Sequence, residues 1–197
     1  LREAGWPLDQ KRDREFEVTG MPTASGTGYV DYVLWGADGL PLAVVEAKRT
    51  TASPAVGQQQ AKLYADCLEA MTGRRPVIYY TNGYERWLWD DAAGYPPRAV
   101  QGFATRDELE LMVQRRHSRL PLVGTQIVAD IAGRPYQQRA IRAVGEAFTV
   151  KRREALLVMA TGAGKTRTVV ALVDQLMRTG WAKRVLFLAD RKALVRQ

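Results

Sequence analysis

Asp31 and the tripeptide Glu46-Ala47-Lys48 have residue types that could carry out metal-dependent chemistry. Two carboxylates that lie close together can share one divalent cation. Because Glu-x-Lys is a common sequence, a structural ion pair between Glu46 and Lys48 explains these residues equally well when they are taken alone. The neighbouring elements have to decide between the two interpretations.

Two apolar segments are expected to position these charged residues. Residues 29–35 and 40–50 are rich in β-branched and aromatic side chains, and a turn-forming stretch at 36–39 separates them. This pattern predicts a β-hairpin. Charged groups at the end of an otherwise apolar hairpin are costly to bury unless they are paired or bind a metal.

The register of this hairpin decides which charges meet. A symmetric turn would place Asp31 opposite residue 44, and Glu46 would share the face of that residue. Lys48, two residues beyond Glu46, would project from the same face. Pro41 can shift this register by one residue. The hairpin therefore predicts that both carboxylates and the amine gather on one face.

A helix is predicted over residues 55–72, in which Val56, Gln60, Tyr64 and Leu68 recur at every fourth position. Gln60 and Tyr64 form an i, i+4 pair and therefore share one helical face. Such a helix could place both side chains beside the charged residues of the hairpin. Alternatively, Tyr64 belongs to the core and Gln60 to the surface.

Further elements follow this helix. Strands are predicted at 77–81 and 86–89, around a turn at Asn82-Gly83, and a short charged helix is predicted at 107–116. Pro96-Pro97 interrupts the pattern between them. The expected order of the first domain is therefore strand, strand, helix, strand, strand, helix.

A glycine-rich stretch, Ala160-Thr161-Gly162-Ala163-Gly164-Lys165-Thr166, predicts a phosphate-binding loop. Glycines let backbone N–H groups converge on phosphate oxygens, and the start of the following helix adds its positive dipole. Lys165 would reach the β- and γ-phosphates of ATP, and the Thr166 hydroxyl would ligate Mg²⁺. The strict pattern has a glycine where Met159 stands, and the alternative is an ordinary strand-to-helix turn with a chance Gly-Lys-Thr.

The elements around this loop predict a parallel α/β sheet. A helix from Pro135 to about Phe148 leads to an apolar strand at 156–160, and the loop is followed by a helix from Lys165 to about Met177. A second apolar strand is predicted at 185–189, and such alternation is typical of parallel sheets. The expected organisation is a domain at 1–117, a linker at 118–134 and a second, truncated domain at 135–197.

The charge of the chain favours a polyanionic partner. Lys and Arg number 29 against 21 Asp and Glu, which gives a formal net charge of +8 and a sequence pI of about 9.8. Such an excess provides salt-sensitive attraction to phosphates. A basic surface that serves only solubility explains the charge about as well.

Cysteine usage and hydropathy indicate an intracellular protein, and we expect a cytoplasmic location. Cys67 and His117 are single residues of their types, so the sequence can form neither an internal disulfide nor a zinc site with three or four Cys and His ligands. No apolar run approaches the ~20 residues that span a bilayer. Because the chain begins at Leu1 and stops at Gln197 within a predicted helix, we expect it to be a fragment of a longer protein.

The first domain resembles the PD-(D/E)xK nucleases, in which an Asp precedes Glu-x-Lys on the next strand. Gln60-Ala61-Lys62-Leu63-Tyr64 is similar to the Gln-x-x-x-Tyr motif of RecB-like members of that family. The resemblance implies a mixed sheet flanked by helices. It implies that Asp31, Glu46 and the Ala47 carbonyl bind Mg²⁺ and that Lys48 orients water. Gln60 and Tyr64 would lie beside the catalytic groups and the DNA backbone.

The second domain resembles superfamily 2 helicases and translocases, which use an Ala-Thr-Gly-x-Gly-Lys-Thr variant of the phosphate loop. Arg134-Pro135-Tyr136-Gln137 is similar to their adenine-recognising glutamine motif, in which Gln137 would read both edges of adenine. Residues 187–195 resemble a motif that touches the nucleic-acid backbone, with Arg191 and Lys192 as candidates unless they only begin a solvated helix. The resemblance implies an incomplete RecA-like domain that binds nucleotide but does not hydrolyse ATP by itself.

A nuclease placed before a motor resembles the restriction (R) subunit of type I restriction enzymes, as do Glu3-Ala4-Gly5-Trp6 and Thr81-Asn82-Gly83. Glu3 is a further candidate acidic group. The resemblance implies a type I site-specific deoxyribonuclease that translocates double-stranded DNA with ATP, cleaves unmodified DNA, and assembles with methyltransferase and specificity subunits. A stand-alone helicase-nuclease of repair or phage defence, and a motor with a non-cleaving DNA-binding domain, are the alternatives.

Overall fold

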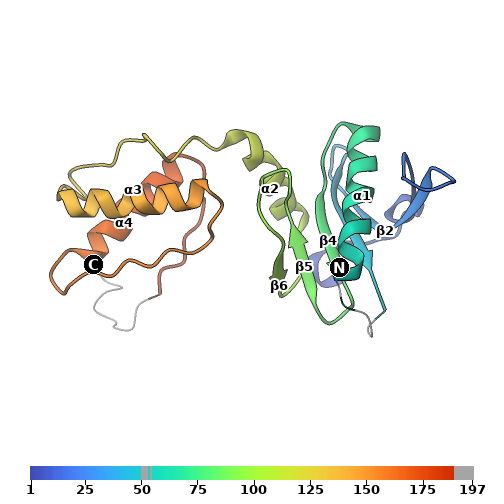
Figure 1. Cartoon of the computed structure of the whole chain (residues 1–197), viewed down its shortest axis with the longest axis horizontal. Helices are drawn as coiled ribbons and strands as arrows, with labels where there is room; N and C mark the ends of the chain where they lie inside the picture. The colour runs from blue at the N-terminus through green and yellow to red at the C-terminus, as the bar shows by residue number, and fades with distance from the viewer. Residues whose placement is uncertain (50–52, 54, 189–197) are drawn as a thin grey trace. The chain divides into compact units, whose positions relative to one another are not determined.

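The computed structural model describes residues 1–49, 53 and 55–188. The chain divides into two compact units, Leu1–His117 and Ser118–Gln197. Each unit has its own core and is described separately below. Figure 1 draws the helices and strands of each unit.

A mixed sheet forms the centre of the first unit, and among the described residues it has six strands in the order β1-β2-β3-β4-β5-β6. All neighbouring strands are antiparallel except β3 and β4, which run parallel. A parallel pair needs a crossover connection, and the helix α1 lies within it. The strands are β1 (Arg14–Thr19), β2 (Thr27–Trp35), β3 (Pro41–Ala47), β4 (Val77–Thr81), β5 (Arg86–Trp89) and β6 (Arg98–Val100).

Helices cover the two faces of this sheet. α1 (Ala55–Thr72) packs over Val44 and Ile78 on one face, and α2 (Arg106–Ser118) brings Leu109 into a second core on the other. Because β3 and β4 are central, almost all of their residues are buried, as their continuous apolar sequences require. Two short 3-10 helices, η1 (Arg2–Ala4) and η2 (Lys11–Asp13), precede β1. The predicted mixed α/β architecture of this unit is present.

The β2–β3 hairpin is formed, but its register differs from the prediction. Tyr32 pairs with Val45 and Val33 with Val44, and the pairing shifts at Leu34/Trp35. Continued by one residue, this register sets Asp31 opposite Glu46, whereas a symmetric turn would set it opposite residue 44. The sequence-based expectation was wrong because the turn closes from Gly36 N to Leu40 O (2.9 Å) and the strand contains an irregularity. The two carboxylates are therefore direct neighbours instead of diagonal ones.

The buried face of α1 also differs from the predicted one. Tyr64 and Leu68 are buried, but Val56 is 66% exposed and Gln60 is half-buried. A strict four-residue interval drifts by about 40° per step around a helix of 3.6 residues per turn. The stripe that faces the sheet combines three- and four-residue steps. It consists of Gly57, Ala61, Tyr64, Ala65 and Leu68.

Two helices dominate the second unit, α3 (Pro135–Thr149) and α4 (Lys165–Arg178), and they start where the sequence predicted. Ile141 of α3 and Ala171 of α4 share a small core with Ile127 and Ala132. Residues 118–134, assigned above to a linker, pack within this unit. Gln175 of α4 donates hydrogen bonds from Nε2 to carbonyls of this segment at residues 122 and 125, both at 3.2 Å.

The two predicted strands of the second unit are not formed. Residues 156–160 and 185–188 are irregular, and Leu156 and Leu186 are 86% and 82% exposed. Residue 189 lies outside the described part of the chain. A parallel strand needs neighbouring strands for its backbone groups, and neither segment pairs with one here. The expected RecA-like sheet is thus absent from residues 118–188, although its helices are present.

None of the helices in the described residues is both long enough and apolar enough to cross a membrane.

Candidate functional site

Asp31 and Glu46 lie together where β2 and β3 pair. Asp31 Oδ2 accepts a hydrogen bond from the Ala47 backbone N–H (2.7 Å), so this carboxylate is held against the tripeptide Glu46-Ala47-Lys48. Glu46 is only 3% exposed, and its Oε1 accepts a hydrogen bond from Lys48 Nζ (2.6 Å). Its other oxygen, Oε2, is buried without a hydrogen-bond partner. A buried carboxylate oxygen without a partner is costly and is rare in native structures.

Burial raises the pKa of Glu46, and the negative charge of Asp31 raises it further, while the hydrogen bond from Lys48 opposes the shift. When both carboxylates are ionised, their two negative charges exceed the single positive charge of Lys48, so the site lacks one balancing positive charge. A divalent cation bound by hard oxygen ligands would supply that charge and a partner for Oε2. The donor set thus fits Mg²⁺ or Mn²⁺.

The protein supplies few ligands for such an ion. Across residues 1–49, 53 and 55–188, no group of three or more His, Cys, Asp and Glu side chains has a metal-binding arrangement. Asp31, Glu46 and a backbone carbonyl would leave the rest of an octahedral shell to water or phosphate oxygens. The geometry therefore favours an ion that binds together with a phosphate-containing ligand.

Lys48 begins a chain of side-chain hydrogen bonds into α1. Its Nζ donates to Gln60 Oε1 (2.7 Å), and Gln60 Nε2 donates to Tyr64 Oη (2.6 Å). Tyr64 is 4% exposed and belongs to the core, as the alternative interpretation expected, and its hydroxyl also contacts Gln60. Gln60 is half-buried between the two groups instead of lying on the open surface. The structure thus gathers all five residues predicted from the first motif: Asp31, Glu46, Lys48, Gln60 and Tyr64.

The Glu46–Lys48 ion pair that served as the alternative interpretation is present, with a 2.6 Å separation. It satisfies one carboxylate oxygen and leaves the other without a partner. Stable buried ion pairs have their remaining lone pairs satisfied by hydrogen bonds. The ion pair alone therefore does not account for the arrangement.

Thr81 supports the site through a contact with β3 that its motif, Thr81-Asn82-Gly83, did not predict. Its carbonyl accepts the backbone N–H of Lys48 (2.8 Å), which extends the β3–β4 pairing beyond the last residue of β3. Its hydroxyl donates to Glu85 O (2.7 Å) and accepts the Gly83 N–H (2.9 Å), which orders the following turn. The sequence pattern predicted two separate strand pairs and did not indicate that β3 and β4 would be neighbours. Glu3 is exposed in η1, whose neighbour Trp6 packs on the α2 side of the sheet.

The glycine-rich loop precedes α4 as predicted. Gly162 and Gly164 have φ of 78° and 81°, a left-handed conformation that glycine adopts without strain. Lys165 is exposed, and its Nζ donates to the carbonyls of Met159 and Ala160, both at 3.2 Å. The amine thus lies over its own loop. Thr161 is exposed and Thr166 is half-buried in the first turn of α4.

Tyr136 and Gln137 contact this loop from the start of α3. Tyr136 Oη donates to Ala163 O (2.9 Å), and Gln137 Nε2 lies 3.3 and 3.4 Å from the carbonyls of Ala163 and Gly164. Gln137 Oε1 accepts the Arg134 N–H (3.3 Å). Both ends of the amide that was expected to read adenine are therefore occupied by the chain in this conformation.

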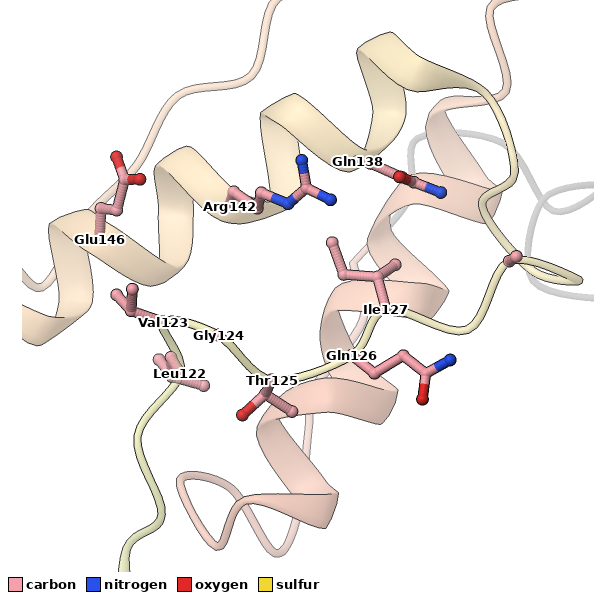
Figure 2. A pocket seen from close by; sticks show the side chains of 10 residues that line it. Leu122, Val123, Gly124, Thr125, Gln126, Ile127, Gln138, Arg142 and Glu146 are labelled. Carbon is pink, nitrogen blue, oxygen red and sulfur yellow. The ribbon is translucent and has the colours of Figure 1, made fainter.

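A pocket of about 530 Å³ lies on another side of α3 (Figure 2). Gln138, Arg142 and Glu146 line it from the helix, opposite residues 122–127. None of its lining residues belongs to the glycine-rich loop, so the pocket is separate from the predicted phosphate site.

Arg191 and Lys192, the candidates for contact with the nucleic-acid backbone, lie outside the described residues.

Comparisons with known proteins match the two parts of the chain to two restriction-enzyme families. Residues 1–96 match the family described as the type I restriction enzyme R protein N terminus, and residues 130–197 match the type III restriction enzyme res subunit family. Together these matches define a subunit of a restriction enzyme. No solved structure matches the chain.

Two curated relatives are subunits of type I restriction enzymes, which favours type I over type III for this chain. The type I restriction enzyme EcoAI endonuclease subunit of Escherichia coli is 33% identical over 94% of this chain and 24% of its own length. The EcoKI endonuclease subunit of Escherichia coli strain K12 is 30% identical over 100% of this chain and 22% of its own length. The chain belongs to the type I restriction enzyme R protein family, and it spans about a quarter of the length of these relatives.

Proposed function

We propose that this chain provides the DNA-cleaving site and part of the ATP-driven motor of a type I restriction enzyme, which translocates double-stranded DNA and cuts it when it is unmodified. The observation that carries the proposal is the meeting of Asp31 and the partnerless Oε2 of Glu46 beside the Lys48 amine. Acid groups of this kind are retained in a core where they bind a cation.

Within this site each residue has a distinct role. Asp31, Glu46 and the Ala47 carbonyl would hold Mg²⁺, which when bound polarises a phosphate oxygen and a water. Lys48 would orient the attacking water and stabilise charge on the phosphate, while it remains within reach of Glu46. Gln60 fixes the amine from the other side, and Tyr64 fixes Gln60.

In the second unit, the loop around Gly162 and Gly164 would bind the phosphates of ATP. Lys165 would exchange the carbonyls it now contacts for β- and γ-phosphate oxygens, and Thr166 would ligate Mg²⁺. Tyr136 and Gln137 support the loop now, and Gln137 would have to release it in order to contact adenine. Nucleotide binding would therefore be coupled to the conformation of the loop.

The distribution of charge supports a division of labour between the units. Residues 1–117 contain 14 Lys and Arg against 16 Asp and Glu, whereas residues 118–197 contain 15 against 5. The excess positive charge of the chain thus lies in the second unit. Non-specific DNA affinity depends on such charge. We infer that the motor unit attracts the duplex and that the acidic nuclease unit cuts DNA delivered to it.

Recognition of the DNA sequence and of its modification is proposed to lie in methyltransferase and specificity subunits. The two relatives are type I endonuclease subunits that match nearly the whole chain, which favours this assignment over a stand-alone helicase-nuclease. The five gathered residues of the first site favour it over a motor with a non-cleaving DNA-binding domain.

Single substitutions in the full-length protein test this proposal. Asp31→Ala or Lys48→Ala should abolish DNA cleavage and leave DNA-stimulated ATP hydrolysis largely intact, because the two sites lie in separate units. Both activities are measured on the same preparation. Equal loss of both in a folded variant would contradict the proposed division of labour.

A further inference from the structure

Two glycines border the contacts that run from Glu46 to Tyr64, and backbone conformation explains neither of them. Gly57 is the third residue of α1, and Gly28 lies in β2. Neither has a positive φ, so an L-residue could adopt the backbone at both positions. The absence of a side chain must therefore be explained by space.

Gly57 lies directly against the two charged residues of β3. A Cβ at this position would be 3.2 Å from Glu46 Cγ, 3.4 Å from Lys48 Cγ and 3.5 Å from Lys48 Cε. Ala61 and Ala65 follow on the same side of α1 and are both 0% exposed. This row of small residues lets the helix approach β3 closely. The close approach covers Glu46 and brings Gln60 within hydrogen-bond distance of Lys48.

Gly28 has the same relation to the other end of the hydrogen-bond chain. A Cβ there would be 2.8 Å from Tyr64 Cε1 and 3.0 Å from Met21 Cγ. The Tyr64 ring is 4% exposed, so it is enclosed and has little room to move aside. Any residue larger than glycine would therefore shift the ring that orders Gln60.

We propose that Gly57 and Gly28 are positioning residues of the nuclease site. Gly57 sets the position of the Glu46 carboxylate and the Lys48 amine, and Gly28 sets the Tyr64 ring, which acts on Lys48 through Gln60. The inference rests on the nuclease function proposed above, because it assigns these glycines to the geometry of that site.

Small displacements at these positions have large effects on chemistry. A methyl group at Gly57 would press on Glu46 Cγ, and the carboxylate beyond that atom would move with it. Metal–ligand distances are held to about ±0.2 Å, and misplacement of a reacting group by ~1 Å can cost ~10²-fold in rate. Alanine is favoured over glycine inside a helix, so Gly57→Ala should not impair the folding of α1 itself.

The test uses the full-length protein with Gly57→Ala, Gly28→Ala and the control Gly102→Ala. Gly102 has no positive φ, and a Cβ there would meet nothing within 4 Å. Three quantities are measured: the rate of DNA cleavage, the rate of DNA-stimulated ATP hydrolysis, and Mn²⁺ binding followed by the electron paramagnetic resonance signal of free Mn²⁺. Lys48→Ala is measured in parallel.

The two glycine variants should differ in their metal binding. Gly57→Ala should slow cleavage by roughly tenfold or more and weaken Mn²⁺ binding, because it displaces a carboxylate ligand. Gly28→Ala should slow cleavage with Mn²⁺ binding unchanged, because it acts on the amine and not on the carboxylates. ATP hydrolysis should be unchanged in both, and Gly102→Ala should match the wild type in all three measurements.

Three other outcomes would contradict either the nuclease assignment or the positioning role of the glycines. If Lys48→Ala cleaves like the wild type, the nuclease assignment itself fails. If Lys48→Ala is inactive but Gly57→Ala has normal cleavage and Mn²⁺ binding, the positioning role is overturned. Loss of ATP hydrolysis together with cleavage in Gly57→Ala would also overturn it, since the proposal places the effect in the nuclease site alone.

Discussion

Glu46→Gln should stabilise the metal-free protein while it abolishes cleavage. The carboxylate is 3% exposed, and one of its oxygens has no hydrogen-bond partner. An unsatisfied buried polar group costs about 1–3 kcal/mol, and more when it is charged. Gln keeps an oxygen for Lys48 and replaces the charged oxygen with a neutral amide. We therefore expect the free energy of unfolding at pH 7 to rise by about 1 kcal/mol, near the lower end of that range because Lys48 already offsets part of the charge.

The pH dependence gives the sign of this effect. Burial raises the pKa of Glu46 above its unfolded value of about 4.5. Its contribution to stability is thus fully present below the unfolded pKa and is lost as pH rises through the folded pKa. The wild type should lose stability relative to Glu46→Gln over that range, and the two should converge at lower pH.

Urea denaturation of residues 1–197 at several pH values, followed by tryptophan fluorescence, measures this difference. Trp6, Trp35, Trp87 and Trp89 lie in the first unit, so the signal reports mainly on the unit that contains Glu46. Mn²⁺ should then stabilise the wild type and not the variant, because only the native site binds the ion. A variant that is destabilised by 2 kcal/mol or more, yet supports normal cleavage in the full-length protein, would show that the pair is purely structural.

Three further predictions concern the motor, the isolated nuclease unit and the scaffold. Lys165→Ala in the full-length protein should stop ATP hydrolysis and translocation, and hence restriction, because an uncharged side chain cannot neutralise the transferring phosphate; near-normal ATPase rates would disprove the phosphate-loop assignment. Residues 1 to about 120 should fold alone, bind Mn²⁺ weakly and cut DNA poorly, and a titration with and without a short duplex should show weaker binding by Asp31→Ala. Identical binding by that variant would mean that no metal site exists there. Arg116→Ala should lower the free energy of unfolding by about 3–5 kcal/mol, since it leaves the buried Asp90 carboxylate unpaired, and a loss below 1 kcal/mol in urea denaturation would contradict this reasoning.

Local patterns in the sequence were sufficient for most elements of the first unit. The hairpin, the helix at 55–72 and the strand pair at 77–81 and 86–89 are all present. β1 and β6 were missed because both are edge strands with exposed, charged residues, which lack the apolar pattern of the central strands. The parallel neighbour relation of β3 and β4 was also missed, because it depends on packing between segments that a sequence pattern does not connect.

The site shows the same division between local and long-range information. Residue types and spacing indicated Asp31, Glu46 and Lys48, and the register shift lies at the Trp35–Pro41 pair, as the presence of Pro41 had suggested. The pairing of Asp31 was still misplaced, because a symmetric turn was assumed. Gly57 gave no local signal, since its role depends on a contact with β3 across the fold. In the second unit, two apolar runs predicted strands, but residues 118–188 contain no neighbouring strand with which either could pair. An apolar, β-branched sequence was therefore not sufficient to form a strand there.

The parallel pairing of β3 with β4 also constrains the order of folding. The backbone of Lys48 is held by the carbonyl of Thr81, so the strand that carries Glu46 has its final support only after α1 has crossed over and β4 has docked. Pairings between segments distant in sequence form late and slowly, because the intervening chain must be ordered first. A nascent chain that has reached only the β2–β3 hairpin therefore carries Asp31, Glu46 and Lys48 without the contact that holds the end of β3 in place.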